Sequence, residues 1–252
     1  MTEQVSVVIG AGSLGTELAA RLSHDSTVLL ADFRREPLHA AAGRIALDGG
    51  EVVTKDVDVR NRQSVRALAT MALGLGPVTR LVYTAGVSPA EALPSAIFTV
   101  DMLGAGIVIE EFEGVIAPDG AAVVVSGMHG HLVGSTLVDP ALESAILASR
   151  VEDLILLPDV QAVLAAARED VDTARAFAFA LAKRVNQLHV RAAAARWALR
   201  GARINSVSPG NLEAVVGPAD AVEFLLGDGS TAINGTDLLV DGGAVATTTY
   251  PA

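Results

Sequence analysis

Cysteine is absent from the 252 residues, and basic residues are scarce. Without a thiol the chain can form no disulfide framework, thiolate metal site or cysteine nucleophile, and this composition suits a reducing cytoplasm. Only 18 Lys and Arg oppose 29 Asp and Glu, which gives a formal net charge of -11. Because nucleic acids and anionic membranes require clustered cations, we expect neither as a partner and favour a small-molecule substrate.

Charged residues are also sparse, at 19%, whereas 51% of the chain is hydrophobic. No apolar run reaches the roughly 18 residues that a membrane-spanning helix needs, and no basic segment followed by an apolar signal region opens the chain. The length and apolar content are enough to bury a large core as one domain. We therefore expect a soluble, cytoplasmic, single-domain protein.

Short β-branched runs alternate with longer helical segments along the chain. The runs predict strands at 5–9, 27–31, 51–54, 79–83, 121–125, 203–206 and 237–240. The longer segments predict helices at 14–22, 37–47, 63–73 and 173–199. Continuous apolar strands are typical of a parallel sheet with helices on both faces. This pattern predicts an α/β fold of the Rossmann type, a doubly wound parallel sheet whose binding crevice lies at the carboxyl ends of the strands.

A glycine motif, VVIGAGSLGTELAARL, follows the first predicted strand and opens the first predicted helix. Gly10 permits a tight turn, Gly12 leaves room for a pyrophosphate, and Gly15 lets the helix approach the strand. At the helix start, Ser13 and Leu14 offer backbone N–H donors and the positive end of the helix dipole. The motif therefore predicts a dinucleotide site, the alternative being a tight turn that binds no ligand.

Asp32 closes the second predicted strand in VLLADFRR. A carboxylate at this distance from the glycines is placed to accept the hydroxyls of an adenosine ribose and to repel a 2′-phosphate, so NAD is favoured over NADP. Arg34 and Arg35 keep NADP open, because either cation could instead face a phosphate. The alternative for Asp32 is a solvated loop carboxylate.

Several further segments share one order with a known family. Together with the glycine turn, this order resembles that of the short-chain dehydrogenases/reductases over nearly the whole chain. The segments are Asp56-Val57 after the third predicted strand, TAG at 84–86 after the fourth, INSVSPG at 204–210 and GTDLLVDGG at 235–243. The glycine spacing is a departure, since many members have a longer gap between the first two glycines.

The resemblance implies a cofactor role for several residues. By this resemblance, Asp56 and Val57 would flank the adenine. Ala85 and Gly86 would lie on the ribose and nicotinamide side, and Pro209-Gly210 would meet the nicotinamide amide. It also implies a homo-dimer or homo-tetramer, because family members associate through the helix that corresponds to the one predicted at 173–199.

The stretch AFAFALAKRV, residues 176–185, matches the family helix that carries Tyr-x-x-x-Lys. In the family the tyrosine exchanges a proton with the substrate oxygen, and the lysine lowers the tyrosine pKa and holds the nicotinamide ribose. Here Phe179 and Lys183 stand at these positions. Lys183 would keep the ribose-binding role, but a phenyl ring has no proton to give. The alternatives are a surface lysine that snorkels over apolar neighbours and a phenylalanine that only packs.

The other family positions are altered as well. The segment AAVVVSGMHGHLVG resembles one that ends in Ser-Ser-x-x-Gly, whose second serine binds the substrate carbonyl. If the closing glycine is Gly130, Gly127 takes the serine position, whereas a shift of one residue would give it to Ser126. The family asparagine after TAG corresponds to Asp101 in FTVDMLGAG.

About forty residues, near 132–172, are inserted between the serine and tyrosine positions relative to the family. The insertion predicts two short helices broken at Pro158, which could cap the cleft or form an oligomer contact. Conversely, the segment after Pro209-Gly210 is short, where family members usually carry a mobile substrate lid.

Candidates for proton transfer are His129, His131, Asp101 and Lys183, and a histidine is the natural acid or base near neutral pH. A loop histidine that is merely solvated is the alternative. The five histidines show no metal-ligand spacing, so no metal site is predicted.

Three functions stay open. We favour an NAD(H)-binding enzyme with atypical, non-redox chemistry on a small organic molecule, such as cyclisation, isomerisation or elimination. The alternatives are an NAD(P)-dependent oxidoreductase with a substituted proton donor, and a non-catalytic binding or scaffold protein.

Overall fold

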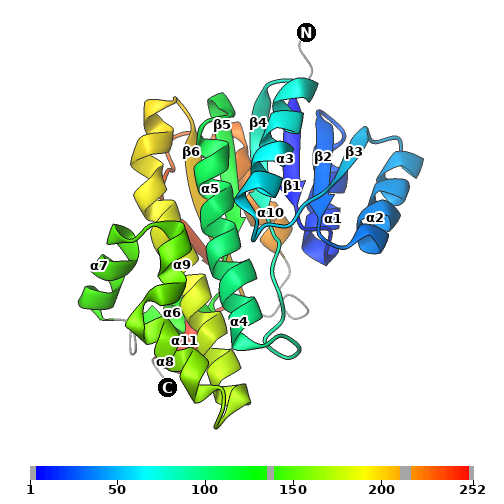
Figure 1. Ribbon diagram of the computed structural model, residues 1–252. Coiled ribbons are helices and arrows are strands. Elements are labelled where there is room, and N and C mark those ends of the chain that lie inside the picture. Colours follow the sequence, from blue (N-terminus) through cyan, green and yellow to red (C-terminus); the bar gives the residue numbers. More distant parts are fainter. Residues whose placement is uncertain (1–3, 135–138, 211–216, 250–252) are drawn as a thin grey trace.

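A parallel sheet of seven strands forms the centre of the computed structural model, which describes residues 4–134, 139–210 and 217–249 (Figure 1). The strands lie in the order β3-β2-β1-β4-β5-β6-β7. Their bounds are Val5–Ile9 (β1), Thr27–Asp32 (β2), Val52–Asp56 (β3), Val78–Tyr83 (β4), Ile116–Val125 (β5), Arg203–Pro209 (β6) and Asp237–Val240 (β7). The predicted doubly wound sheet is confirmed. Its strand order reverses between β1 and β4, where such sheets bind ligands.

Helices cover both faces of the sheet, as Figure 1 shows. One face carries α1 (Ser13–Leu22), α2 (Arg35–Leu47) and α10 (Pro218–Leu226). The other carries α3 (Arg62–Leu75), α5 (Ala105–Glu113) and α9 (Val171–Leu199). All five residues of β1 are buried, because a strand between two helical layers has no solvent face.

Side-chain caps explain where two of these helices begin. The Asn61 side chain accepts hydrogen bonds from the N–H groups of Gln63 and Ser64, at 2.9 and 3.2 Å, at the start of α3. At the start of α9, Asp170 caps the N–H groups of Asp172 and Thr173 in the same way. Each cap satisfies donors that a first helical turn leaves free. The caps therefore start α3 one residue and α9 two residues before the apolar patterns that predict them.

A third group of short helices lies beyond the carboxyl edge of the sheet and packs on the first half of α9. Its members are α4 (Pro94–Ile97), the π-helix η1 (Phe98–Gly104), α6 (His129–Gly134), α7 (Pro140–Ala148), the 3₁₀-helix η2 (Val151–Leu156) and α8 (Pro158–Ala166). Their apolar side chains form a separate cluster in which Phe98, Met102 and Leu154 are fully buried. The inserted segment thus has its own core and shares it with η1.

The expectation of two inserted helices broken at Pro158 is wrong in number. Within the described residues the insertion holds α7, η2 and α8, and Pro158 is the first residue of α8. Proline suits this place because the first N–H of a helix has no intrahelical partner.

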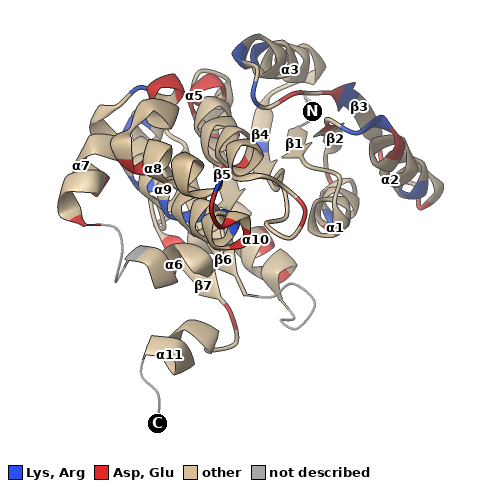
Figure 2. Ribbon diagram, turned by 60° about the horizontal axis from the view of Figure 1, so that its bottom comes forward, with Lys and Arg blue, Asp and Glu red and all other residues tan. Residues whose placement is uncertain are grey.

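The last described helix lies outside the layered body. After the short 3₁₀-helix η3 (Asp228–Ser230) and the edge strand β7, the helix α11 (Ala244–Thr249) has no buried residue (Figure 2). Figure 2 also shows Asp and Glu spread over several helices. Among the described residues, no helix is long and apolar enough to cross a membrane.

Candidate functional site

The glycine motif forms the turn from β1 to α1 and packs against the residue that follows β4. Gly10 has a φ of +113°, and a Cβ there would lie 2.5 Å from Thr84 Oγ1. A Cβ on Gly15 would lie 1.9 Å from the Gly10 carbonyl oxygen, whereas one on Gly12 would meet nothing within 4 Å. Two of the glycines are therefore required by the fold itself. The third keeps space open beside the first turn of α1, which begins at Ser13 and Leu14.

A cavity of about 290 Å³ opens from this turn. Its lining includes six of the residues predicted to bind a cofactor: Gly10, Gly12, Asp32, Val57, Ala85 and Gly86. These come from the carboxyl ends of β1, β2, β3 and β4. The sheet therefore gathers side chains that are far apart in the sequence around one crevice.

Asp32 is fixed by the backbone on both sides. Its Oδ2 accepts a hydrogen bond from the Ala11 N–H at 2.7 Å, and its Oδ1 accepts one from the Arg34 N–H at 2.8 Å. The side chain is 11% exposed, and each carboxylate oxygen retains a lone pair. Asp32 can therefore accept hydroxyl groups from a ligand without leaving the glycine turn.

Arginines at the Asp32 end of the cavity are paired with carboxylates. Arg35 contacts Asp56 at 2.5 Å, and Arg60 donates hydrogen bonds to both carboxylate oxygens of Asp58, each at 2.8 Å. The Arg60 guanidinium holds the pKa of Asp58 below its usual range. The structure thus pairs Asp56 with an arginine of α2, and Asp58 joins Val57 in the cavity lining instead.

The sequence analysis missed several cavity residues, among them Phe33, Arg60 and Thr84. The Phe33 ring is 66% exposed, and the Arg60 guanidinium lies 5.4 Å from its centroid. The Thr84 hydroxyl donates to the carbonyl oxygens of Ile9 and Gly10. Thr84 belongs to the TAG segment and could have been found there, whereas Phe33 and Arg60 belong to no motif.

Pro209 and Gly210 lie at the carboxyl end of β6, outside the lining of this cavity. The Pro209 carbonyl accepts the Met128 N–H at 2.9 Å, and the Gly210 N–H donates to the Val240 carbonyl at 2.9 Å. The short segment that follows, at 211–216, lies outside the described residues.

A second group of residues lies where α9 meets η1 and α6. The Lys183 Nζ lies 3.3 Å from Asp101 Oδ2 and 4.8 Å from the centroid of the Phe179 ring. The His129 ring meets Phe179 edge-on, with centroids 5.4 Å apart. Phe179 therefore contacts both the lysine and the histidine. We call His129, Phe179, Lys183 and Asp101 the central cluster.

Lys183 and Asp101 are the buried members of the central cluster. Lys183 is 7% exposed and Asp101 is fully buried. Burial raises the pKa of Asp101, and the positive charge of Lys183 opposes that rise. Separating a buried ion pair is costly, because water does not reach either charge to take the place of its partner.

His129 is the exposed member, at the first position of α6. Partial burial of its imidazole lowers its pKa, and the nearby charge of Lys183 lowers it further. At neutral pH the ring is therefore uncharged and can accept a proton.

His131 belongs to a different polar group. Its Nε2 lies 2.6 Å from Asp237 Oδ2, and the other oxygen of Asp237 accepts hydrogen bonds from Ser206 and Ser208. These partners lie on β6 and β7. The structure thus separates His131 from the central cluster, although only one residue lies between the two histidines in the sequence.

Ser126 and Gly127 also have different surroundings. The Ser126 hydroxyl is buried and donates to the Lys183 carbonyl oxygen at 2.8 Å. A Cβ on Gly127 would lie 3.5 Å from Lys183 Cγ, in ordinary contact with the side chain. Residue 127 therefore borders the lysine stem, whereas Ser126 joins β5 to the backbone of α9.

The chain is similar in sequence to proteins of one family. A family model described as short chain dehydrogenase matches residues 4–111, which include the glycine turn and Asp101. A short-chain dehydrogenase/reductase from Alternaria brassicicola, bsc3, is 32% identical over 275 residues, covering 98% of this chain and 97% of the relative.

Solved structures show the same fold at lower identity. A citronellol catabolism dehydrogenase from Pseudomonas aeruginosa PAO1 aligns with a TM-score of 0.68 at 22% identity, over 96% of this chain and 95% of its own. An actinorhodin polyketide ketoreductase with NADPH aligns with a TM-score of 0.69 at 19% identity, over 96% and 97%. With its sheet order, its glycine turn and a relative matched over nearly the whole length, the chain belongs to the short-chain dehydrogenase/reductase family.

Proposed function

We propose that this protein binds NAD(H) and acts on a small organic molecule by acid-base chemistry without hydride transfer, as in a cyclisation, an isomerisation or an elimination. The observation that carries the proposal is Phe179, which contacts both Lys183 and His129 and, by the resemblance, stands where the family has tyrosine. The phenyl ring cannot exchange a proton. Six of the residues predicted to bind the cofactor nevertheless line one cavity: Gly10, Gly12, Asp32, Val57, Ala85 and Gly86.

The cavity beside the glycine turn fits a dinucleotide. Gly12 leaves open the space that a pyrophosphate needs at the start of α1, and Asp32 has lone pairs free for ribose hydroxyls. Arg35 and Arg60 are each paired with a carboxylate, and the exposed Arg34, which also lines the cavity, has its Nε 3.8 Å from Asp32 Oδ1. A 2′-phosphate would have to break these pairs and approach Asp32, so NAD is favoured over NADP. The ketoreductase solved with NADPH is a neighbour in fold alone.

When bound, the nicotinamide dinucleotide offers the substrate a charged surface, and in the family it also supplies a hydride. The residues of this chain provide proton acceptance and a fixed cation. His129 is uncharged at neutral pH because its pKa is lowered, and it is exposed at the mouth of the central cluster. It can therefore remove a proton from a substrate carbon or hydroxyl. Lys183 provides the positive charge that stabilises an oxyanion.

The test combines cofactor titration with product analysis. NADH fluorescence is followed as the protein is added, and a panel of enones, hydroxyketones and polyenes is then incubated with NADH that carries deuterium at its transferable position. We expect saturable NADH binding and products of unchanged mass or of mass reduced by one water, without deuterium. Deuterium in the product would refute the non-redox proposal, and absence of NADH binding would refute the cofactor site.

One observation favours a second function, the NAD⁺-dependent oxidation of an alcohol. Oxidation requires a group that accepts the hydroxyl proton, and the lowered pKa of His129 keeps its imidazole ready to do so. If this reaction occurs, NADH accumulates with alcohols and NAD⁺, and His129→Gln lowers kcat at least about 100-fold. A smaller loss would mean that another group takes the proton.

We also propose that the protein is a homo-dimer or homo-tetramer that associates through α9. The outer surface of the second half of α9 exposes Ala192, Ala195 and Ala198, and Leu199 is 89% exposed. Light scattering on the purified protein tests this proposal, and a monomer at micromolar concentration would contradict it.

A further inference from the structure

A second cavity lies between α5, α9 and the inserted helices. Its volume is about 250 Å³, and it shares no lining residue with the cavity beside the glycine turn. One wall is a stripe of α5 within residues 106–113, and another is a stripe of α9 within residues 189–196, because residues three or four apart share one face of a helix. The end of α7 and the start of η2 line a third side. We call this space the α5–α9 cavity.

Small residues on both long helices leave the α5–α9 cavity open. Gly106 lines it from α5 and Ala192 from α9. A Cβ on Gly106 would lie 2.9 Å from Val151 Cγ1 and 3.1 Å from His189 Nδ1, so a larger residue there would displace its neighbours. The buried side chains of Val151 and Ile146 add apolar wall from the inserted segment. A molecule that binds here therefore places an apolar body between the helices.

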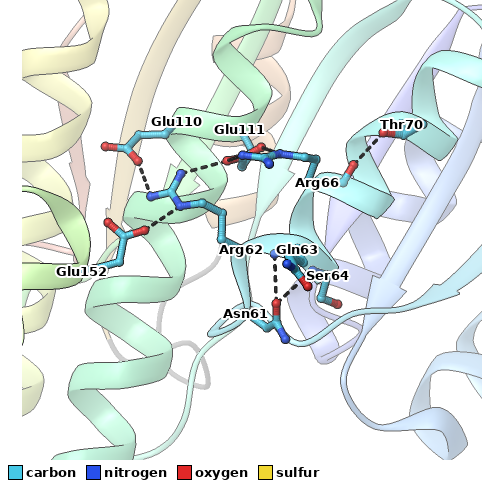
Figure 3. Close-up of polar contacts among 9 residues, drawn as sticks. All are labelled: Asn61, Arg62, Gln63, Ser64, Arg66, Thr70, Glu110, Glu111 and Glu152. Atoms are coloured by element: carbon cyan, nitrogen blue, oxygen red, sulfur yellow. Dashed lines mark hydrogen bonds and ion pairs between the residues drawn. The ribbon is translucent and has the colours of Figure 1, made fainter.

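The charged side chains that line the α5–α9 cavity already have partners. Glu113 Oε2 lies 2.8 Å from Arg196 Nε, so these two charges compensate each other. Glu110 contacts Arg62 of α3 at 2.5 Å (Figure 3). An ionic ligand would have to break one of these pairs or stay without a counter-charge, which is costly away from water. The cavity therefore favours an uncharged molecule.

His189, in contrast, has an open hydrogen-bonding position. Its Nδ1 is buried and has no hydrogen-bond partner among the described residues. Burial, and to a lesser extent the charge of Arg196, lowers the pKa of His189 to about 4, so the imidazole is uncharged near neutral pH. A neutral imidazole donates from one nitrogen and accepts at the other, and a hydroxyl group can match either role. Because buried polar groups without a partner are rare, this one points to a ligand.

We propose that the α5–α9 cavity is a second ligand site, which binds a small uncharged molecule with an apolar body and one hydroxyl group, such as a phenol, through a hydrogen bond to His189. The size is suitable, because a protein cavity of about 150 Å³ holds benzene and this one is larger. The dinucleotide cavity stays free when this site is filled, since the two share no lining residue.

Phenol and toluene test the site, because they have nearly the same shape and differ by a hydroxyl and a methyl group. The sequence contains five histidines, so in protein with isotope-labelled histidine the His189 signal is the one that His189→Leu removes. We expect phenol to shift this signal with a Kd of about 1 mM or less, and toluene to bind at least about threefold more weakly. A His189 signal that stays in place up to about 10 mM phenol would overturn the proposal.

His189→Leu tests the hydroxyl contact itself. Without the imidazole the preference should reverse, because phenol must then bury its hydroxyl without a partner whereas toluene has none to bury. Ligand-observed NMR measures both affinities in this variant. A preference for phenol that survives in His189→Leu would show that another group holds the hydroxyl, and would overturn the role of His189.

Ala192→Phe covers the case in which His189→Leu does not fold. Ala192 is exposed and lines the cavity, so a phenyl ring there can fill the space without replacing His189. Ala195→Phe, also exposed on α9 but outside the lining, is the matched control. We expect Ala192→Phe to weaken phenol binding at least about tenfold and Ala195→Phe to change it less than about twofold. Equal phenol affinity in Ala192→Phe and the parent would place the ligand elsewhere.

A second copy of the chain is the alternative occupant, because Ala192 also belongs to the α9 surface of the proposed oligomer. If a partner fills the cavity, phenol affinity falls as the protein concentration rises through the range in which light scattering detects association. An affinity independent of protein concentration supports the ligand site, and a fall of more than about tenfold would overturn it. Failure of the protein to bind NADH would refute the proposed function without affecting the phenol titration.

Discussion

By the proposed correspondence, Phe179 stands at the position of the family tyrosine, from which it differs by one oxygen atom. Because the ring is half-buried and contacts both His129 and Lys183, we expect Phe179→Tyr to fold. NADH affinity should change less than about twofold. Carbonyl reduction should not rise more than about tenfold, since residue 127 is glycine and the Ser126 hydroxyl already donates to the Lys183 carbonyl oxygen.

Phe177→Tyr, two positions away and also half-buried, is the matched control for Phe179→Tyr. Steady-state oxidation of NADH with a panel of ketones measures both variants. A gain of several hundredfold in Phe179→Tyr alone would mean that a complete reductase site lacks only its hydroxyl.

Two glycines of the β1–α1 turn allow folding and binding to be tested separately. Gly15→Ala places a methyl group 1.9 Å from the Gly10 carbonyl, so we expect it to cost roughly 3 kcal/mol or more in unfolding free energy. Gly12→Ala meets no atom within 4 Å and should unfold like the parent, yet lose NADH affinity at least about tenfold. Urea unfolding and NADH fluorescence measure the pair. Unchanged NADH binding in Gly12→Ala would place the pyrophosphate elsewhere.

The sequence was most informative at residues whose role depends on backbone geometry. Gly10 and Asp32 were placed correctly, because a glycine turn after a strand and a carboxylate after the next one fix their own positions in this fold. The contact of Asp101 with Val87 and Lys183 could not be predicted, since it depends on a π-helix that no local pattern signals. The separation of His129 from His131 depends on Asp237, more than a hundred residues away.

At the level of elements, one arginine joins the inserted segment to the dinucleotide-binding half. Arg62 of α3 contacts Glu110 and Glu111 of α5 and Glu152 of η2, at 2.5, 2.9 and 2.6 Å (Figure 3). The same side chain lowers the pKa of Glu152. Since η2 also packs against η1, this ion cluster helps to hold the helix that carries Asp101.

Removing this arginine should loosen η2 without unfolding the sheet. Arg62→Ala should lose about 1–2 kcal/mol in unfolding free energy, because three partly exposed pairs disappear together. Arg66→Ala is the control: Arg66 is 63% exposed and, among the described residues, pairs with Glu111 alone, so its loss should leave the unfolding free energy nearly unchanged. Faster proteolysis between residues 139 and 170 in Arg62→Ala would locate the effect. If the difference between the two variants persists in about 1 M salt, it does not arise from charge.

The inserted segment shows what the sequence pattern leaves open at this scale. The apolar stretch before Pro158 predicted one helix, but η2 is a 3₁₀-helix that begins after Arg150. The two side chains belong to different apolar clusters: Val151 packs against α5 and Leu154 against η1. Such a division is set by tertiary packing, whereas the long, regular pattern of α9 predicted that helix to within two residues at its start.

For the whole molecule, lowering the pH should reduce the unfolding free energy in two separate pH ranges. Asp25, Asp58 and Glu111 have pKa values lowered by paired arginines, so the stability they contribute is present above about pH 4 and is lost as the pH falls through their folded values. An earlier loss, below about pH 6.5, must come from groups that are uncharged in the folded protein and become protonated on unfolding.

His189 of α9 is the main candidate for this earlier loss. Burial, and to a lesser extent Arg196, lowers its pKa to about 4, and its Nδ1 has no hydrogen-bond partner among the described residues. The unfolded chain, with a histidine pKa near 6.5, then binds more protons than the folded one between these values. Lowering the pH from about 7.5 to about 5 should therefore cost roughly 2 kcal/mol in unfolding free energy through His189 alone.

His189→Leu should remove most of this loss, because an apolar side chain in the same place takes up no proton on unfolding. A smaller loss should remain, since the lowered pKa of His129 acts in the same direction. His39→Asn, on the exposed side of α2, should keep the parent slope. Urea unfolding of the three proteins at both pH values measures these losses in unfolding free energy. Equal slopes in His189→Leu and the parent would mean that His189 accepts its proton in the folded protein.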